Sequence, residues 1–264
     1  MTIPETGYPR AAAVSPRVQV VDTTDSTNAD VIAALAADPE AWPHLSVLVT
    51  TDQRHGRGRL DRSWVAPAGT ALAISTVLRM PGLPVAARGW IPLVAGLAMR
   101  RAIAEQLSGT GHQVALKWPN DVLADGGKIC GILAEAVPQH PDAVVVGAGV
   151  NTRMQQVDFP VTTASSFAAM GQECDDDRLL ADYLTALDEQ LTALVAAGGD
   201  ADAAGLRAAL TEACATLDTE VRVGLPDGGI LEGTAVEIDP SGRLVVLAAG
   251  VRTPVAAGDV THVR

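Results

Sequence analysis

Several apolar segments rich in β-branched residues constrain the fold more than any other feature of this sequence. One of them, LSVLVTTD at 45–52, is apolar at Leu45 and from Val47 to Val49. A strand of this kind is buried on both faces, so we expect it inside a sheet. Because aromatic residues make up only 3% of the chain, the core must consist of Val, Leu, Ile and Ala. The predicted strands are VQVVDT at 18–23, LSVLVTTD at 45–52, ALAISTVL at 71–78, VALKWP at 114–119, DVLAD at 121–125, GGKICGILAEAV at 126–137 and DAVVVGAGVN at 142–151.

Helical spacing appears between these strands. Asp25 or Ser26 provides an N-cap for a helix in which Val31, Ile32 and Leu35 share one face. A later amphipathic segment opens with three acidic residues, which stabilise the positive end of a helix dipole. The predicted helices cover about 85–107, 175–198 and 202–214, and a polar loop is predicted at 152–174.

The character of the sequence changes near its C-terminus. From Thr219 onward, short strand-like runs alternate with Pro-Asp-Gly-Gly and Pro-Ser-Gly turns. Several strands within so short a segment favour a small SH3-like β-barrel. The prolines and small residues of the first 17 positions read as a flexible tail. The predicted units are therefore a tail over 1–17, a main domain over 18–216 and a small domain over 217–264.

Positive charge is concentrated in one short segment of an acidic chain. The formal net charge is -12, yet RHGRGRLDRSW at 54–64 holds four arginines and two glycines. Proteins that bind polyanions usually carry a basic domain or stripe. The overall charge therefore counts against a nucleic-acid-binding module that uses this segment, although that alternative stays open at this point.

The sequence also indicates the cellular compartment of the protein. We find no secretory leader and no run of about 20 apolar residues. Cys130, Cys174 and Cys214 are widely spaced and form no CxxC pair, which argues against a disulfide framework or a zinc site. We expect a cytoplasmic protein that binds no membrane.

Four short segments carry residues suited to chemistry. They are DSTN at 25–28, TDQRHGRGRLDRSW at 51–64, KWPND at 117–121 and GGKICGIL at 126–133. A helix start offers free backbone N–H groups to an anion or ureido group, and glycines let the backbone approach a ligand. Taken singly, the four read as an N-cap, an exposed loop, a β-turn and a hairpin. Of 19 basic residues only Lys117 and Lys128 are lysines, which favours a compact point charge at those positions over chance retention.

Taken together and in this order, STN, GRGR…W, KWPND, GGKICGIL and GAGVN resemble the biotin protein ligases. The resemblance covers about 18–151 by motif and extends by pattern to the C-terminus. It implies a mixed β-sheet flanked by helices, related to class II aminoacyl-tRNA synthetases, with a small SH3-like C-terminal domain. It also implies a two-step reaction in which biotin and ATP, with Mg²⁺, give biotinyl-5′-AMP. Biotin then passes to a lysine of the carboxyl-carrier domain of an acyl-CoA or pyruvate carboxylase.

The resemblance also implies roles for individual residues. Lys128, Arg59 and Asp121 are the expected catalytic residues, Lys117 stays outside the primary set, and metal ligands are not assigned. The loop 152–165 is expected to close over the nucleotide. The residues expected at biotin are Ser26, Thr27, Asn28, Gln53, Arg57, Gly58, Arg59, Lys128 and Gly131, and those expected at ATP or the adenylate are Arg59, Arg62, Trp64, Asn120, Asp121, Lys128 and Asn151.

One departure from the family pattern, one expected absence and three alternatives accompany this hypothesis. Leu60-Asp61 stands where the family commonly has a glycine. The flexibility of the loop and the role of Arg62 therefore stay open. Only about 17 residues precede the first strand, so we expect a ligase without a DNA-binding domain. The alternatives are a lipoate or octanoate ligase of related fold, a nucleic-acid-binding module, and a non-catalytic protein on a degenerate ligase fold.

Overall fold

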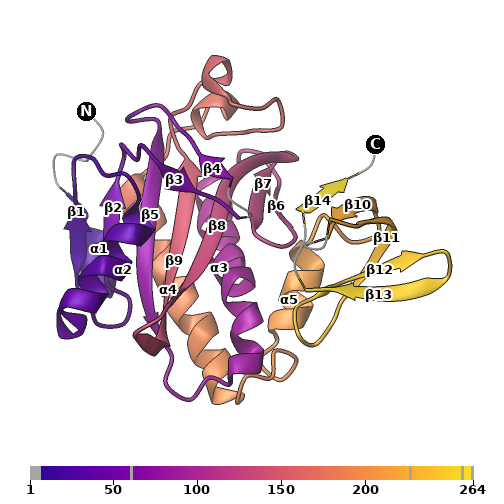
Figure 1. Cartoon of the computed structure of the whole chain (residues 1–264). Coiled ribbons are helices and arrows are strands. Elements are labelled where there is room, and N and C mark those ends of the chain that lie inside the picture. Colours follow the sequence, from indigo (N-terminus) through magenta and orange to yellow (C-terminus); the bar gives the residue numbers. More distant parts are fainter. Residues whose placement is uncertain (1–6, 60–61, 226–227, 257–258, 263–264) are drawn as a thin grey trace.

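The structure is a computed structural model that describes residues 7–59, 62–225, 228–256 and 259–262 (Figure 1). Its centre is a seven-stranded sheet with the order β1-β2-β5-β9-β8-β7-β6. Strands β1 and β2 pair in parallel and every other neighbouring pair is antiparallel, so the sheet is mixed, as predicted. Its strands are β1 (Val18–Val20), β2 (Val47–Thr50), β5 (Ala71–Arg79), β6 (Val114–Lys117), β7 (Asp121–Ala124), β8 (Gly127–Val137) and β9 (His140–Asn151).

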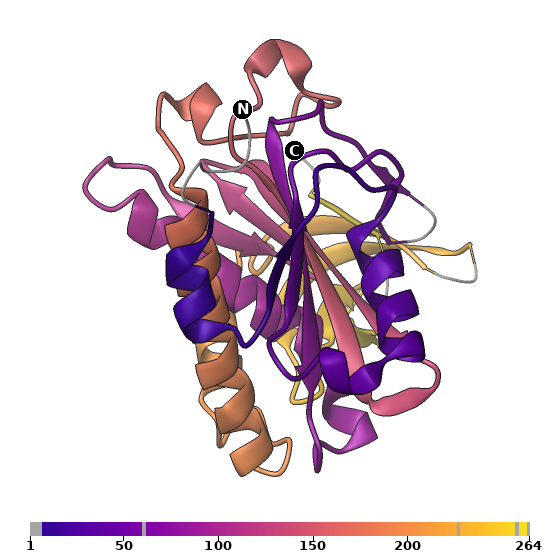
Figure 2. The same cartoon turned by 90° about the vertical axis from the view of Figure 1, so that its left-hand side faces the viewer.

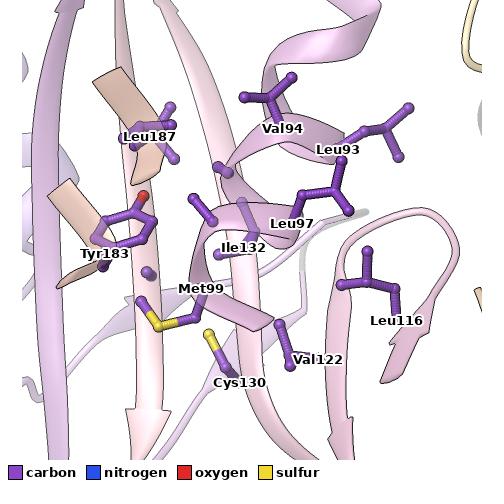
Figure 3. Close-up of a cluster of buried hydrophobic side chains, with 14 of the residues drawn as sticks. Leu93, Val94, Leu97, Met99, Leu116, Val122, Cys130, Ile132, Tyr183 and Leu187 are labelled. Carbon is purple, nitrogen blue, oxygen red and sulfur yellow. The ribbon is translucent and has the colours of Figure 1, made fainter. Parts of the chain in front are cut away.

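Helices cover both faces of this sheet (Figure 2). Side chains alternate along a strand, so Val47 and Val49 of β2 join the core beneath α3 and α4, while Leu48 joins a smaller core beneath α2. The larger core packs Leu97 and Met99 of α3 against the strands and against α4 (Figure 3). The helices are α1 (Pro9–Val14), α2 (Thr27–Ala37), α3 (Ile91–Gln106), α4 (Asp176–Ala196) and α5 (Leu206–Ala213), and the 3-10 turns are η1 (Pro39–Ala41), η2 (Val85–Trp90), η3 (Gln156–Asp158) and η4 (Ala168–Met170).

Two helices begin later than the sequence predicts. The segment expected as one helix from 85 is a 3-10 turn followed by α3, which starts at Ile91 with Pro92 in its first turn. Proline suits that position because its missing N–H would have no intrahelical partner there. Helix α5 starts at Leu206 rather than near 202, since Gly205 has a left-handed backbone (φ 73°) that a helix cannot contain.

The expectation of a flexible tail over 1–17 is wrong for its second half. Helix α1 packs on α4, and both Tyr8 and Ala11 are buried. The Asp177 carboxylate accepts hydrogen bonds from the backbone N–H groups of Arg10 and Ala11, each at 3.0 Å. These first-turn amides have no intrahelical acceptor, so a carboxylate on α4 satisfies them. Residues 1–6 lie outside the described part of the chain.

The C-terminal strands form a second, antiparallel sheet that contacts the first domain (Figure 1). The indole N–H groups of Trp118 and Trp90 donate to the carbonyls of Gly242 (3.0 Å) and Pro240 (2.9 Å). The sequence predicts a small SH3-like β-barrel here, and the described residues form an antiparallel sheet of short strands in the order β13-β12-β11-β10-β14, in which β13 and β14 are not paired with each other. The strands are β10 (Glu220–Gly224), β11 (Ile230–Ile238), β12 (Leu244–Ala248), β13 (Val251–Val255) and β14 (Asp259–His262).

Candidate active site

One cavity of about 170 Å³ gathers almost all of the residues named from the sequence. It is walled by the start of α2, a short hairpin, the KWPND turn and the adjoining strands of the sheet, and Val260 of β14 also borders it. Of the predicted site residues, Asn151 does not line it. The predicted residues that do are Ser26, Thr27, Asn28, Gln53, Arg57, Gly58, Arg59, Arg62, Trp64, Asn120, Asp121, Lys128 and Gly131.

The start of α2 supplies a polar cluster. Ser26 is the N-cap, as predicted, and its Oγ accepts from the Ala29 N–H at 3.4 Å. Gln53 Oε1 accepts from the Thr27 N–H (2.9 Å) and hydroxyl (3.0 Å). Ser75 Oγ, which sequence reasoning missed, lies 2.8 Å from Thr27 Oγ1. Because Thr27 and Ser75 are buried and Thr27 is hydrogen-bonded to both Ser75 and Gln53, the orientations of these groups are fixed before a ligand arrives.

The arginine-glycine segment forms a two-stranded hairpin rather than an irregular loop. Strands β3 (Gly56–Arg57) and β4 (Ser63–Trp64) pair, with Gly56 opposite Trp64. Arg57 reaches Glu135 of β8 (Nη2 to Oε2, 3.1 Å), and Arg59 reaches Asn120 in the KWPND turn (Nη1 to Oδ1, 3.1 Å). The question that Leu60-Asp61 raised lies outside the described residues.

Arg54 differs from the other three arginines of this segment. Its guanidinium pairs with Asp52 at 3.2 Å, and Arg54 does not line the cavity. Arg57, Arg59 and Arg62 line it together with Lys117 and Lys128. Five cations therefore surround one cavity of an acidic chain, and this arrangement suits a small ligand that carries more than one negative charge.

A β-bulge brings the Lys128 side chain to the cavity. In the β7–β8 pairing, Val122 faces Cys130 but Leu123 faces Lys128, so Ile129 is the extra residue. In a regular strand, residues three positions apart point to opposite faces, and the bulge removes that alternation. Lys128 consequently extends over Gly131, where a Cβ atom would lie 3.1 Å from Nζ.

The ammonium group of Lys128 is held by a carboxylate. Its Nζ lies 2.6 Å from Asp121 Oδ1, and the two side chains are 39% and 18% exposed. Asp121 stands opposite Lys117 across the β6–β7 hairpin, whose turn contains a cis Trp118-Pro119 bond. Burial raises the pKa of the neighbouring Cys130 thiol, so this cysteine stays protonated and unreactive.

Three glycines, Gly131, Gly147 and Gly149, form what we call the glycine floor of the cavity. They lie on one face of β8 and β9, where Gly131 pairs with Gly149. A Cβ atom on Gly147 would lie 2.6 Å from Asn28 Oδ1, and one on Gly149 would lie 2.4 Å from Trp64 Cε2. The asparagine and the indole therefore pack directly on the backbone of β9. The GxG spacing within a predicted strand could have revealed this, since alternate residues share a face.

Asn151 stands apart because its amide bonds to backbone. Its Nδ2 donates to the Ser165 carbonyl at 2.9 Å and lies 3.4 Å from the Lys128 carbonyl. Lys128 N–H in turn donates to the Thr163 carbonyl at 2.7 Å. Asn151 thus fastens the loop after β9 beside the start of β8. Arg153 has no role that could be predicted from the sequence, and its Nη1 lies 2.7 Å from Asp176 Oδ2 at the start of α4.

The side chains that line the cavity include few metal ligands. Within the described ranges, no three His, Cys, Asp or Glu side chains form a group able to hold a metal ion. The cavity instead offers the carboxylate of Asp121 and the amide of Asn120. Mg²⁺ commonly takes only one or two protein carboxylates and completes its shell with water and substrate phosphates. This lining therefore fits a magnesium ion that enters with a nucleotide.

Comparisons with known proteins identify the family of this chain. Residues 20–151 match the biotin/lipoate A/B protein ligase family, and residues 216–263 match the biotin protein ligase C-terminal domain. A biotin–[acetyl-CoA-carboxylase] ligase of Mycobacterium tuberculosis is 36% identical over 250 residues, which is 94% of this chain and 90% of the relative. A ligase of the same name from Paracoccus denitrificans is 43% identical over 131 residues, covering 48% of this chain and 51% of that protein.

Solved structures agree on the fold. The biotin protein ligase of Aquifex aeolicus, determined in complex with biotin and ATP, superimposes with a TM-score of 0.75 at 23% identity and covers 94% of this chain and 99% of its own. None of the described helices has the length and apolarity to span a bilayer. The two matching domain models and the Mycobacterium relative show that this chain belongs to the biotin/lipoate A/B protein ligase family and, within it, to the biotin protein ligases.

Proposed function

We propose that this chain is an ATP-dependent biotin protein ligase, which forms biotinyl-5′-AMP and transfers biotin to a carrier lysine. One observation carries the proposal: a buried polar cluster at the start of α2 and five cationic side chains line the same cavity. The polar cluster suits the ureido ring of biotin, and the cations suit a carboxylate next to a triphosphate. Membership of the family supports this assignment.

The first step requires two anions to meet. A carboxylate oxygen of biotin attacks the α-phosphorus of ATP, and pyrophosphate leaves as the new acyl–phosphate bond forms. Lys128 is well suited to stabilise the charge that develops at this phosphorus, since its ammonium is preorganised by Asp121 (2.6 Å). Arg59, which Asn120 orients, adds a second donor for phosphate oxygens. Bound magnesium would offset phosphate charge, and Asp121 with Asn120 would hold it.

The second step requires a dry site. The neutral amine of a carrier lysine attacks the acyl carbon of the mixed anhydride, AMP leaves with the bonding electrons, and an amide forms. Water would compete for the same carbon. Trp64 is half-buried and packs on Gly149, where it would shield the anhydride until the carrier arrives.

The partners follow from this reaction. We propose biotin and the carboxyl-carrier domain of an acyl-CoA or pyruvate carboxylase, and neither DNA nor a membrane. A reducing cytoplasm is the proposed compartment, because Cys130, Cys174 and Cys214 are all free thiols. We further propose that 18–216 and 217–264 are the functional units of the chain.

A mass measurement tests the function. The full chain is mixed with biotin, Mg-ATP and a purified biotin carboxyl-carrier domain, and the carrier is weighed. The expected result is a gain of one biotin per carrier, with pyrophosphate release. Parallel reactions with lipoate or octanoate serve as controls. A carrier that gains no biotin would refute the proposal, and a gain from lipoate alone would assign the chain to the related ligases.

A further inference from the structure

Glu135 of β8 contacts two residues of the cavity although no sequence motif marked it. It follows Gly131 and Leu133 at alternate positions, so its side chain is on the cavity face of the strand. Its carboxylate is largely buried, with 23% of the side chain exposed. Oε2 accepts from Asn28 Nδ2 at 2.7 Å and from Arg57 Nη2 at 3.1 Å.

The first contact fixes which way the Asn28 amide faces. An ionised carboxylate can only accept hydrogen bonds, so the NH₂ group of Asn28 must face Glu135. Its second N–H reaches the Leu133 carbonyl at 3.3 Å, and Oδ1 lies 2.5 Å from Ser75 Oγ. Both amide donors are therefore occupied within the protein. Asn28 can therefore interact with a ligand only through the remaining lone pair of Oδ1, which accepts a hydrogen bond from an N–H group.

The second contact ties the arginine-glycine hairpin to the sheet. Arg57 belongs to β3 and pairs with Glu135 on β8. A single carboxylate therefore joins the hairpin, the start of α2 and a central strand. The Arg57 side chain is 47% exposed and that of Glu135 23%, so solvent screens part of the attraction and the pair acts mainly by fixing geometry.

We propose that Glu135 is a positioning residue that sets the hydrogen-bonding polarity of the biotin pocket by orienting Asn28, and that holds Arg57 beside it. The proposal rests on the proposed function, because the N–H that Asn28 accepts is assigned to the ureido ring of biotin. Glu135 itself acts through Asn28 and Arg57.

A polarity exchange between the two side chains tests the coupling. Asn28→Asp puts a second carboxylate beside Glu135, and the repulsion should displace the side chain and weaken biotin binding about 10- to 100-fold. Adding Glu135→Gln supplies an amide that donates to the new carboxylate and still accepts from Arg57. The double variant should recover at least about tenfold in biotin affinity over Asn28→Asp alone. A role limited to stabilising the fold would not produce such a rescue.

Calorimetric titration of the full chain with biotin measures these affinities, and thermal unfolding confirms that each variant folds. Glu189→Gln is the matched control: Glu189 pairs with Arg101 at 2.8 Å on an exposed surface, and its change should not rescue Asn28→Asp. If Glu135→Gln fails to rescue, or if Glu189→Gln rescues equally, the positioning role is wrong. If the unaltered chain itself binds no biotin, with or without ATP, the proposed function fails instead.

Discussion

At the scale of single residues, lysine and arginine have different roles in the cavity. The chain has only two lysines, and both line the cavity. The positions of the lysines among the many arginines are therefore not random. Arginine binds oxygen pairs through a fixed planar fork, whereas the ammonium of lysine has three donors around one atom. Lys128 can therefore keep Asp121 while it turns another N–H toward a phosphate or carboxylate oxygen.

Replacing Lys128 should separate chemistry from folding. Lys128→Ala is expected to lower the rate of biotin-dependent pyrophosphate release on the order of 100- to 1,000-fold, because it removes the preorganised charge that we propose acts on the reacting phosphorus. Equilibrium unfolding should change little, since the side chain is 39% exposed. Lys128→Arg is the comparison variant: it keeps the positive charge but replaces a single ammonium nitrogen by a wide planar fork, so it should not restore the full rate. Pyrophosphate release at the normal rate in Lys128→Ala would mean that the role belongs to another cation.

At the scale of elements, two strands build the floor of the site with features that sequence motifs describe only in part. The motifs GGKICGIL and GAGVN identify Lys128 and the glycines, but not the bulge at Ile129 that turns Lys128 toward Gly131. A bulge depends on the pairing with β7, and the sequence of one strand does not record its register. Asn151 illustrates the same limit, because its backbone partners come from a loop that folds back onto β8.

Substitutions in the glycine floor should affect the KM values for biotin and ATP differently. Gly147→Ala places a methyl group 2.6 Å from Asn28 Oδ1, so it should raise KM for biotin most, by about tenfold or more. Gly149→Ala places one 2.4 Å from Trp64 Cε2, so it should raise KM for ATP most and alter tryptophan fluorescence, since the other three tryptophans are buried. Steady-state kinetics with each substrate varied in turn measures both effects. Equal changes in the two KM values for both variants would contradict this division of the floor.

Helix α3 makes a different prediction, for stability rather than activity. Met99 is fully buried between the sheet and α4 (Figure 3), so Met99→Ala should lower the free energy of unfolding by about 2–5 kcal/mol. Denaturant titration measures the loss. KM values measured well below the melting temperature should stay normal, because Met99 does not line the cavity. Altered substrate KM in the folded variant would show that this core and the site are coupled.

At the scale of the whole molecule, the apolar runs and turn chemistry predicted the individual strands. The resemblance to the biotin protein ligases implied that the sheet is mixed and which residues meet in the cavity. Apolar periodicity works because burial on a strand repeats every two residues. The same reasoning missed α1, since PRAAAV is too short and too uniform to indicate a buried face, and its stability comes from Asp177 on a distant helix. The order of the five C-terminal strands could not be predicted for a related reason: which strands pair with each other is a long-range property.

The two domains meet at a histidine, which makes their contact sensitive to pH. His262 of β14 lies 3.3 Å from Thr216 Oγ1, and its pKa is lowered from 6.5, first by burial and then by the charge of Lys117. The folded state therefore favours the neutral ring, so the unfolded state binds more protons near and below pH 6.5. The stabilisation is present above that pH and is lost as the pH falls through the folded-state value.

The free energy of unfolding should accordingly decrease between pH 7.5 and 5.5, and His262→Asn should flatten part of that slope by removing the titrating group. Denaturant titrations at several pH values provide the measurement. His55→Asn is the control, because His55 is 77% exposed and away from this contact, so its slope should match that of the unaltered chain. The charge of Lys117 disfavours protonation of His262, and Lys117 also borders the cavity. A protonated His262 would therefore repel a cation of the site, so acidification should weaken activity before the chain unfolds. An unchanged pH slope in His262→Asn would show that another group controls the acid sensitivity of the domain contact.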